Sequence, residues 1–118
     1  MSDAVRVEDR DRVRHITLNR PEKINALDAA MMLAIAIALS GVDVQRHDAI
    51  VLSGEGERGF CAGADIAEFS QGVDSLARQE HALVAMIEAF ALCQVPIAVM
   101  AHGRALGAGA TLLTLADL

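Results

Sequence analysis

Two short segments near the N-terminus alternate apolar and polar residues, at positions 5–8 and 13–18. Such alternation is typical of strands that bury one face, and a charged stretch at 9–12 separates the two segments. The pattern predicts an antiparallel hairpin with one buried face. Pro21 marks the end of the second strand, because proline lacks the backbone N–H that a strand ladder needs.

Helical and buried-strand patterns alternate after the hairpin. Residues 29–39 are uniformly apolar, with Asp28 as N-cap and Gly41 as terminator, and predict a helix covered on more than one side. The apolar runs at 49–53 and 95–101 predict short buried strands, and residues 65–69 predict one helical turn. Residues 110–115 predict the start of a further helix. Alternating strands and helices indicate an α/β fold.

Residues 74–92 form the clearest amphipathic pattern in the chain. The predicted apolar face of this helix comprises Leu76, Leu83, Ile87 and Phe90, with Val84 and Ala91 beside it. The predicted solvent face comprises Arg78, Glu80, His81 and Glu88. His81 and Glu88 are therefore interpreted as solvated helix positions.

Composition and charge exclude several classes of protein. Hydrophobic residues make up 53% of the 118 residues, which is enough to build a core, and the net charge is −6. Aromatic residues make up only 3%, so the chain lacks the usual stacking platforms for nucleic acid. The negative net charge also argues against nucleic-acid binding. The longest apolar run is too short to cross a bilayer, and the charged first dozen residues do not resemble a signal peptide. With only Cys61 and Cys93, a disulfide framework is not expected, and we expect a cytoplasmic protein.

A glycine-rich turn after the strand at 49–53 invites a dinucleotide-binding interpretation. Gly54, Gly56 and Gly59 have the spacing of that motif. However, Glu55 and Glu57 would repel a pyrophosphate, and no helix follows to hold it. A tight structural turn is the preferred interpretation.

Three further segments are rich in small residues or in strand-ending signals. They read LNRPEKINAL at 18–27, FCAGADI at 60–66 and GRALGAGA at 103–110, with PIA at 96–98 before the last. Small residues let a ligand approach the backbone, and a helix start offers unpaired N–H groups. Each segment alone also fits close packing. Together and in this order they resemble the crotonase family, the enoyl-CoA hydratase/isomerase superfamily.

The resemblance implies a spiral of ββα units that binds acyl-CoA thioesters, of which residues 1–118 would be the N-terminal portion of a single, incomplete domain. It places the two backbone N–H donors of an oxyanion hole at Ala64 and Ala108, where they hold the thioester carbonyl as it becomes an enolate. The positions matching the family's CoA-binding loops are Lys23, Ile24, Ala26, Ala62, Asp65, Ile66 and Gly107. No cofactor is implied beyond coenzyme A as part of the substrate, and the family forms trimers or hexamers.

Two departures from the family pattern affect the expected reaction. Thr111 stands where family hydratases carry a glutamate, and a hydroxyl is a poor general base near neutral pH. The second catalytic carboxylate of the family would lie beyond Leu118. Isomerase, lyase or hydrolase activity is therefore favoured over hydration by two glutamates. The alternative is a truncated, catalytically inactive module that serves in binding or assembly.

The other polar candidates carry weaker signals. His102 follows a strand near the expected site, and a structural role is favoured because no orienting partner is evident. Glu68 follows the oxyanion loop and either faces the acyl group or is structural. Cys61 has no neighbouring cation or base in the sequence, so a reactive thiol is not expected. No spacing of His, Cys, Asp and Glu predicts a metal site.

Overall fold

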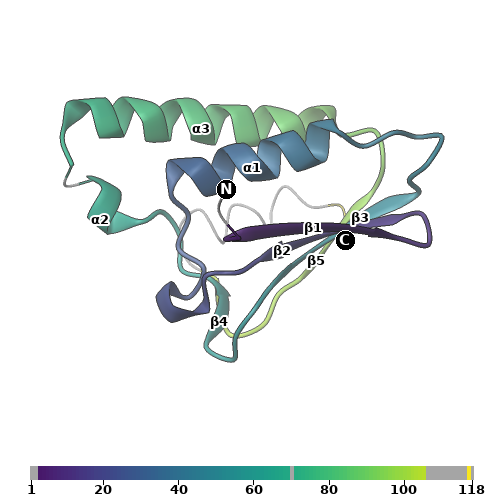
Figure 1. Ribbon diagram of the computed structural model, residues 1–118, viewed down its shortest axis with the longest axis horizontal. Coiled ribbons are helices and arrows are strands. Elements are labelled where there is room, and N and C mark those ends of the chain that lie inside the picture. The colour runs from purple at the N-terminus through teal and green to yellow at the C-terminus, as the bar shows by residue number, and fades with distance from the viewer. Residues whose placement is uncertain (1–2, 70, 106–116, 118) are drawn as a thin grey trace.

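A computed structural model describes residues 3–69, 71–105 and 117 of the chain (Figure 1). Its strands are β1 (Val5–Arg10), β2 (Val13–Leu18), β3 (Ala49–Gly54), β4 (Gly59–Cys61), β5 (Ile97–Met100) and β6 (Arg104–Ala105). Its helices are the 3₁₀ turn η1 (Pro21–Lys23) and the α-helices α1 (Ala29–Ser40), α2 (Ile66–Phe69) and α3 (Val73–Leu92). The predicted α/β class is confirmed. The further helix expected at 110–115 lies outside the described residues.

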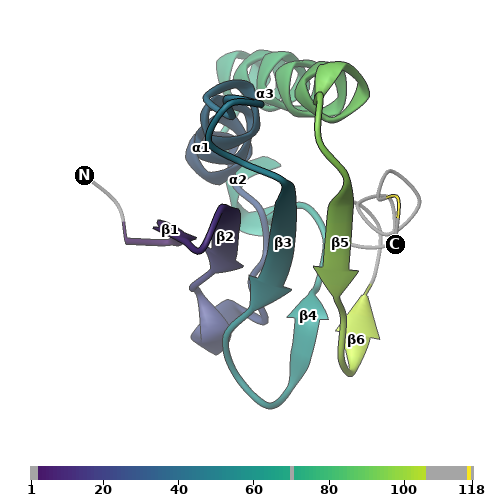
Figure 2. The same cartoon turned by 90° about the vertical axis from the view of Figure 1, so that its right-hand side faces the viewer.

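Four strands form one sheet in the order β1-β2-β3-β5. β1 and β2 pair antiparallel, as the alternation predicts, whereas β2–β3 and β3–β5 are parallel. β4 and β6 form a separate parallel pair. Figure 2 shows α1 and α3 together on one side of the four-stranded sheet, with β4 and β6 beyond the ends of β3 and β5. Residues from β2, β3, β5, α1 and α3 are buried in one hydrophobic cluster.

The hairpin turn is tighter than the sequence predicts. β1 continues to Arg10, so only Asp11 and Arg12 connect the two strands. Both connecting residues have positive φ, 51° and 67°. This is the geometry whose twist matches two paired strands across a two-residue loop. The charges at 9–10 are therefore part of an exposed edge strand, where they oppose pairing with another sheet.

α1 forms where its capping residues predict. The Asp28 carboxylate accepts a hydrogen bond from the Met31 N–H at 2.8 Å, and the helix ends before Gly41. Burial of Met31, Met32 and Ile35 confirms that α1 is covered on more than one side. A further face is open, because the side chain of Ile37 remains 73% exposed.

The predicted apolar face of α3 is only partly correct, since Phe90 is buried as predicted but the other large side chains of that face are not. Leu76 and Val84 are exposed, and Leu83 and Ile87 are only half-buried. The buried face comprises Ser75, Gln79, Ala82, Met86, Ala89 and Phe90. Small side chains on this face let α3 approach α1 closely, and its polar side chains are held by hydrogen bonds to backbone carbonyls near α2. The predicted solvent face of α3 is confirmed, since all four of its residues are exposed.

The predicted strand at 95–101 is only partly buried. β5 begins at Ile97, is the last strand of the described sheet, and ends at an exposed Met100. β3, in contrast, lies between two parallel neighbours, as its continuous apolar run predicts.

An ion-pair cluster joins β1, β2 and the segment before β3. The Arg14 guanidinium binds both carboxylate oxygens of Asp9, at 2.8 and 3.0 Å, and donates to the Ala38 carbonyl at the end of α1. The buried His47 places Nε2 3.2 Å from Asp9 Oδ2, and its Nδ1 accepts from the Asp43 N–H. Hydrogen bonding to Arg14 is the main reason that the pKa of Asp9 lies well below its usual range; burial opposes this effect, and His47 adds to it.

Candidate active site

Two loops that lie far apart in the sequence are joined through their backbones. One loop follows β2 and runs through η1 to the start of α1, and the other connects β4 to α2. The Ala62 N–H donates to the Ile24 carbonyl at 2.8 Å, and the Leu27 N–H donates to the Gly63 carbonyl at 2.7 Å. The Asp65 N–H returns a bond to the Leu27 carbonyl at 2.8 Å. Leu27 and Ala64 thus form an isolated parallel bridge.

This bridge sets the direction of the Ala64 amide. In a parallel bridge one residue bonds the two neighbours of its partner, and the partner's own N–H and C=O point to the opposite side. The Ala64 N–H therefore points away from Leu27. Among the described residues it has no hydrogen-bond partner, although the residue is half-buried. A half-buried, unpaired N–H is a donor available to a ligand.

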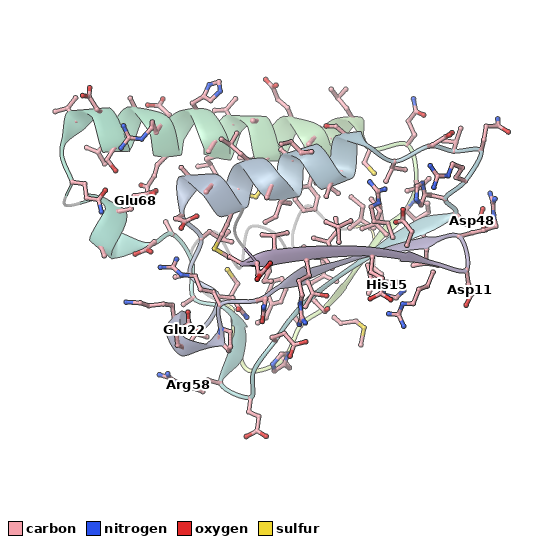
Figure 3. All side chains as sticks on the ribbon, in the orientation of Figure 1. Asp11, His15, Glu22, Asp48, Arg58 and Glu68 are labelled. Atoms are coloured by element: carbon pink, nitrogen blue, oxygen red, sulfur yellow. The ribbon has the colours of Figure 1, made fainter. Side chains whose placement is uncertain are left out.

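The structure brings most of the predicted site residues to this junction. Ile24, Ala26 and Ala62 lie along the paired loops, with Asp65 beside them. Lys23 is exposed at the end of η1, and Ile66 begins α2. Figure 3 shows Glu22 of η1 and Arg58, which precedes β4, at the same end of the molecule. Gly107, Ala108 and Thr111 lie outside the described residues.

Asn25 organises the junction, a role that the sequence analysis missed. Asn25 is fully buried, at 0% exposure. Its backbone has a positive φ of 55°, in the left-handed region. Its Oδ1 accepts from the Arg20 N–H at 2.7 Å, and its Nδ2 donates to the carbonyls of Phe60 and Glu55 at 2.9 and 3.0 Å. Gly54 allows this approach, because a Cβ there would lie 2.8 Å from Asn25 Nδ2. The available signal was an asparagine directly after a proline turn, since asparagine tolerates positive φ.

Arg20 is the second residue that the sequence analysis missed. Its guanidinium Nη2 lies 2.8 Å from Asp65 Oδ2, and its Nη1 donates to the Ala26 carbonyl at 3.0 Å. Burial acts to raise the pKa of Asp65. The ion pair with Arg20 and the N–H groups of Ala67 and Glu68 outweigh that effect, so the pKa is lowered overall. The Asp65 carboxylate is therefore an ionised structural partner of Arg20.

Two roles were predicted for Glu68, facing the acyl group or supporting the structure, and the structure shows the supporting contact. Its carboxylate accepts a hydrogen bond at 2.9 Å from the N–H of Ala29, the first residue of α1. Negative charge at a helix start is stabilised by the unpaired N–H groups there. Figure 3 shows Glu68 on α2, below the end of α3.

The remaining candidates also have structural partners. His102 Nε2 lies 2.6 Å from the Gly56 carbonyl, so the histidine fastens the glycine-rich turn to the segment before β6. That turn leads into β4 and not into a helix, which agrees with rejecting a dinucleotide site. The Cys61 thiol is buried and hydrogen-bonded to the Asn25 carbonyl, and burial raises its pKa, so it is not an activated nucleophile.

Two hollows lie between α1 and α3, and the larger one is remote from the junction. The larger, about 770 Å³, runs between the C-terminal halves of the two helices and is lined in part by Ile37 and Leu92. The smaller, about 520 Å³, lies near the helix starts and includes Glu68. Ala64 lines neither. We therefore place the candidate site at the Ala64 amide, which has no hydrogen-bond partner among the described residues, and not at either hollow.

The described part of the chain has neither a cluster of metal-ligating side chains nor a membrane-spanning helix. No cluster of three or more His, Cys, Asp or Glu side chains there could hold a metal ion. None of the helices described is both long and apolar enough to cross a membrane.

The chain is a mixed α/β protein in which two loops far apart in the sequence pair through their backbone groups. The model of the enoyl-CoA hydratase/isomerase family matches residues 13–118. The chain belongs to this family, and the crotonase resemblance of its motifs is confirmed.

Individual relatives agree with this assignment. A protein named "Probable enoyl-CoA hydratase" from Rhizobium meliloti is 40% identical over 94% of this chain and 43% of its own length. The peroxisomal Delta(3,5)-Delta(2,4)-dienoyl-CoA isomerase of Arabidopsis thaliana is 31% identical over 90% of this chain and 43% of its own length. The crystal structure of an enoyl-CoA hydratase/isomerase from Pseudoalteromonas atlantica superimposes with a TM-score of 0.86 at 31% identity, over 98% of this chain and 45% of that one. The chain thus spans less than half the length of these relatives.

Proposed function

We propose that this chain supplies the acyl-CoA site and the first oxyanion-hole donor of an enzyme that forms a thioester enolate. The observation that carries the proposal is the Ala64 N–H, which is half-buried, unpaired among the described residues and directed away from Leu27 by the bridge. A rigid N–H aimed at an oxygen stabilises negative charge as it develops there. Family resemblance supports Ala108 as the second donor, which lies outside the described residues.

The loops around Ala64 suit a CoA thioester. Ala26, Ala62 and Ala64 are half-buried along these loops and have small side chains, so a thioester can approach the backbone closely. Lys23 is exposed at the end of η1, where its ammonium group can meet a phosphate of CoA. We further propose that the reaction is an isomerisation, a lyase reaction or a hydrolysis, because Thr111 replaces the glutamate that family hydratases use. A homo-oligomer, as in the family, is proposed for the full-length protein.

The proposal is tested by removing the backbone N–H donor of residue 64. Ala64→Pro deletes the N–H and keeps a small side chain, whereas the control Ala64→Gly keeps the N–H. In the full-length protein we expect kcat for a CoA thioester to fall by about 10² or more in Ala64→Pro, the scale of one oxyanion donor. Ala64→Gly should stay within a few-fold of the parent protein. Full activity in a folded Ala64→Pro protein would contradict the mechanism.

Thr111 favours a second candidate function, a catalytically inactive binding or assembly module. The two candidates make different predictions for the full-length protein. An enzyme turns over at least one enoyl- or acyl-CoA thioester, whereas a module binds the thioester and returns it unchanged. Calorimetric binding of butanoyl-CoA, combined with chromatographic separation of the products formed from enoyl- and acyl-CoA thioesters, distinguishes them.

A further inference from the structure

We infer that Arg20 is a positioning residue that holds the Ala64 N–H in its working direction, an inference that rests on the proposed function. Arg20 follows β2 and is mostly buried, with 21% of its side chain exposed. Its guanidinium reaches both sides of the Leu27–Ala64 bridge. Nη2 binds Asp65, the residue after Ala64, and Nη1 binds the Ala26 carbonyl, just before Leu27.

The backbone around Ala64 needs such a tether on its C-terminal side. Gly63 precedes Ala64 with φ 101°, a conformation open to glycine, so the chain before the amide is held by its hydrogen bonds to Ile24 and Leu27 and not by intrinsic stiffness. After the amide, Asp65 is fixed through both carboxylate oxygens. Oδ2 pairs with Arg20 at 2.8 Å, and Oδ1 accepts from the Ala67 N–H at 3.0 Å. Arg20 therefore completes the anchoring of the peptide that carries the donor.

Arg20 also balances charge near the developing oxyanion. An unpaired Asp65 carboxylate, one residue from Ala64, would oppose negative charge on the thioester oxygen. The guanidinium offsets this charge at 2.8 Å from Asp65, and it also lies 3.7 Å from the Asp28 carboxylate. Because the guanidinium already serves Asp65 and Ala26, its role toward the substrate is exerted through the Ala64 amide.

A planar guanidinium suits this position better than an ammonium group. It presents donors in a rigid fork, so one side chain reaches a carboxylate and a carbonyl at fixed angles. A lysine keeps the charge but lacks the fork. Arg20→Lys should therefore retain charge balance while loosening the geometry, and Arg20→Gln should lose both.

The carbonyl stretching frequency of a bound thioester tests this role directly, because it reports how strongly a donor polarises the carbonyl. We would bind butanoyl-CoA labelled with ¹³C at the carbonyl to the full-length protein and measure the shift by isotope-edited infrared spectroscopy. S-Butyl-CoA, a thioether without that carbonyl, reports CoA binding alone. Arg58→Gln is the matched control, since Arg58 is exposed at the same end of the molecule (Figure 3).

We expect Arg20→Gln to lose more than half of the carbonyl shift and about 10- to 10²-fold in kcat, the scale of a misplaced catalytic group. The dissociation constant of S-butyl-CoA should change by less than about 3-fold, because the CoA contacts remain. Arg20→Lys should fall between the parent and Arg20→Gln, and Arg58→Gln should match the parent.

A parent-like carbonyl shift and kcat in Arg20→Gln would overturn the inference. Should Arg20→Gln fail to fold, Arg20→Lys decides: a reduced shift supports the role, and an unchanged shift overturns it. A parent protein that binds butanoyl-CoA without any carbonyl shift would instead contradict the proposed function, so the two failures are distinguishable.

Discussion

Replacing the buried Asn25 should destabilise the protein more than replacing any exposed or half-buried polar side chain of the two paired loops. Asn25→Ala removes three hydrogen bonds to backbone groups, those of Arg20, Phe60 and Glu55. The Phe60 carbonyl, left buried without this partner, costs about 1–3 kcal/mol, and the part-buried bonds to Arg20 and Glu55 contribute about 0.5–1.5 kcal/mol each. An alanine in the left-handed region adds about 1 kcal/mol. We therefore expect the free energy of unfolding to fall by about 4 kcal/mol, a large share of the roughly 5–15 kcal/mol typical of a domain.

Two controls separate the contributions to this loss. Asn25→Gly removes the same hydrogen bonds but tolerates φ 55°, so it should be about 1 kcal/mol less destabilising than Asn25→Ala. Asn19→Ala removes a single exposed hydrogen bond to the Asp3 carbonyl and should cost less than about 1 kcal/mol. Urea unfolding followed by circular dichroism measures all three. A loss below about 1 kcal/mol for Asn25→Ala would refute the assignment of Asn25 as the organiser of the junction.

Three further predictions concern other parts of the molecule. Because the pKa of Asp9 lies below its ordinary value of 3.8, its pairing stabilises the fold above that pH and is lost as the pH falls below it; acid unfolding of Asp9→Asn should show a weaker pH dependence there than the parent. The isolated 118-residue chain should self-associate through the groove between α1 and α3. In sedimentation, Ile37→Glu should therefore shift the chain toward the monomer, whereas Val44→Glu, outside the groove, should not, and a parent chain that is monomeric when dilute would count against this. The full-length protein should hydrate crotonyl-CoA at least about 10²-fold more slowly than a two-glutamate relative, and Thr111→Glu should raise the rate, as followed by loss of enoyl thioester absorbance; equal rates would refute the interpretation of Thr111.

Local chemistry explains which parts of the fold were predictable. The cap at Asp28, the proline after β2 and the apolar run of β3 act within a few residues, so the pattern shows them directly. The buried face of α3 was not predictable in this way. Its position depends on how closely α3 approaches α1 and on backbone carbonyls in or next to α2 that accept its hydrogen bonds. The spacing of apolar residues within the helix predicts neither of these contacts.

The candidate site shows the same division. The motifs place Ala64 and Asp65 together, and family resemblance gives Ala64 a chemical role. Arg20 and Asn25 hold the loops around Ala64 in place. Their partners lie about 30 to 45 residues away in the sequence, and these contacts form only when the chain folds. A single sequence contains the residue types for these contacts but not their distances.

The central claim is that the Ala64 N–H binds the carbonyl oxygen of a CoA thioester. A crystal structure of the full-length protein with butanoyl-CoA would test it most directly. We expect the thioester oxygen to lie about 2.7–3.1 Å from the Ala64 nitrogen, on the side of the bridge opposite Leu27. A thioester oxygen beyond hydrogen-bond distance of Ala64, with the acyl group ordered, would contradict the account.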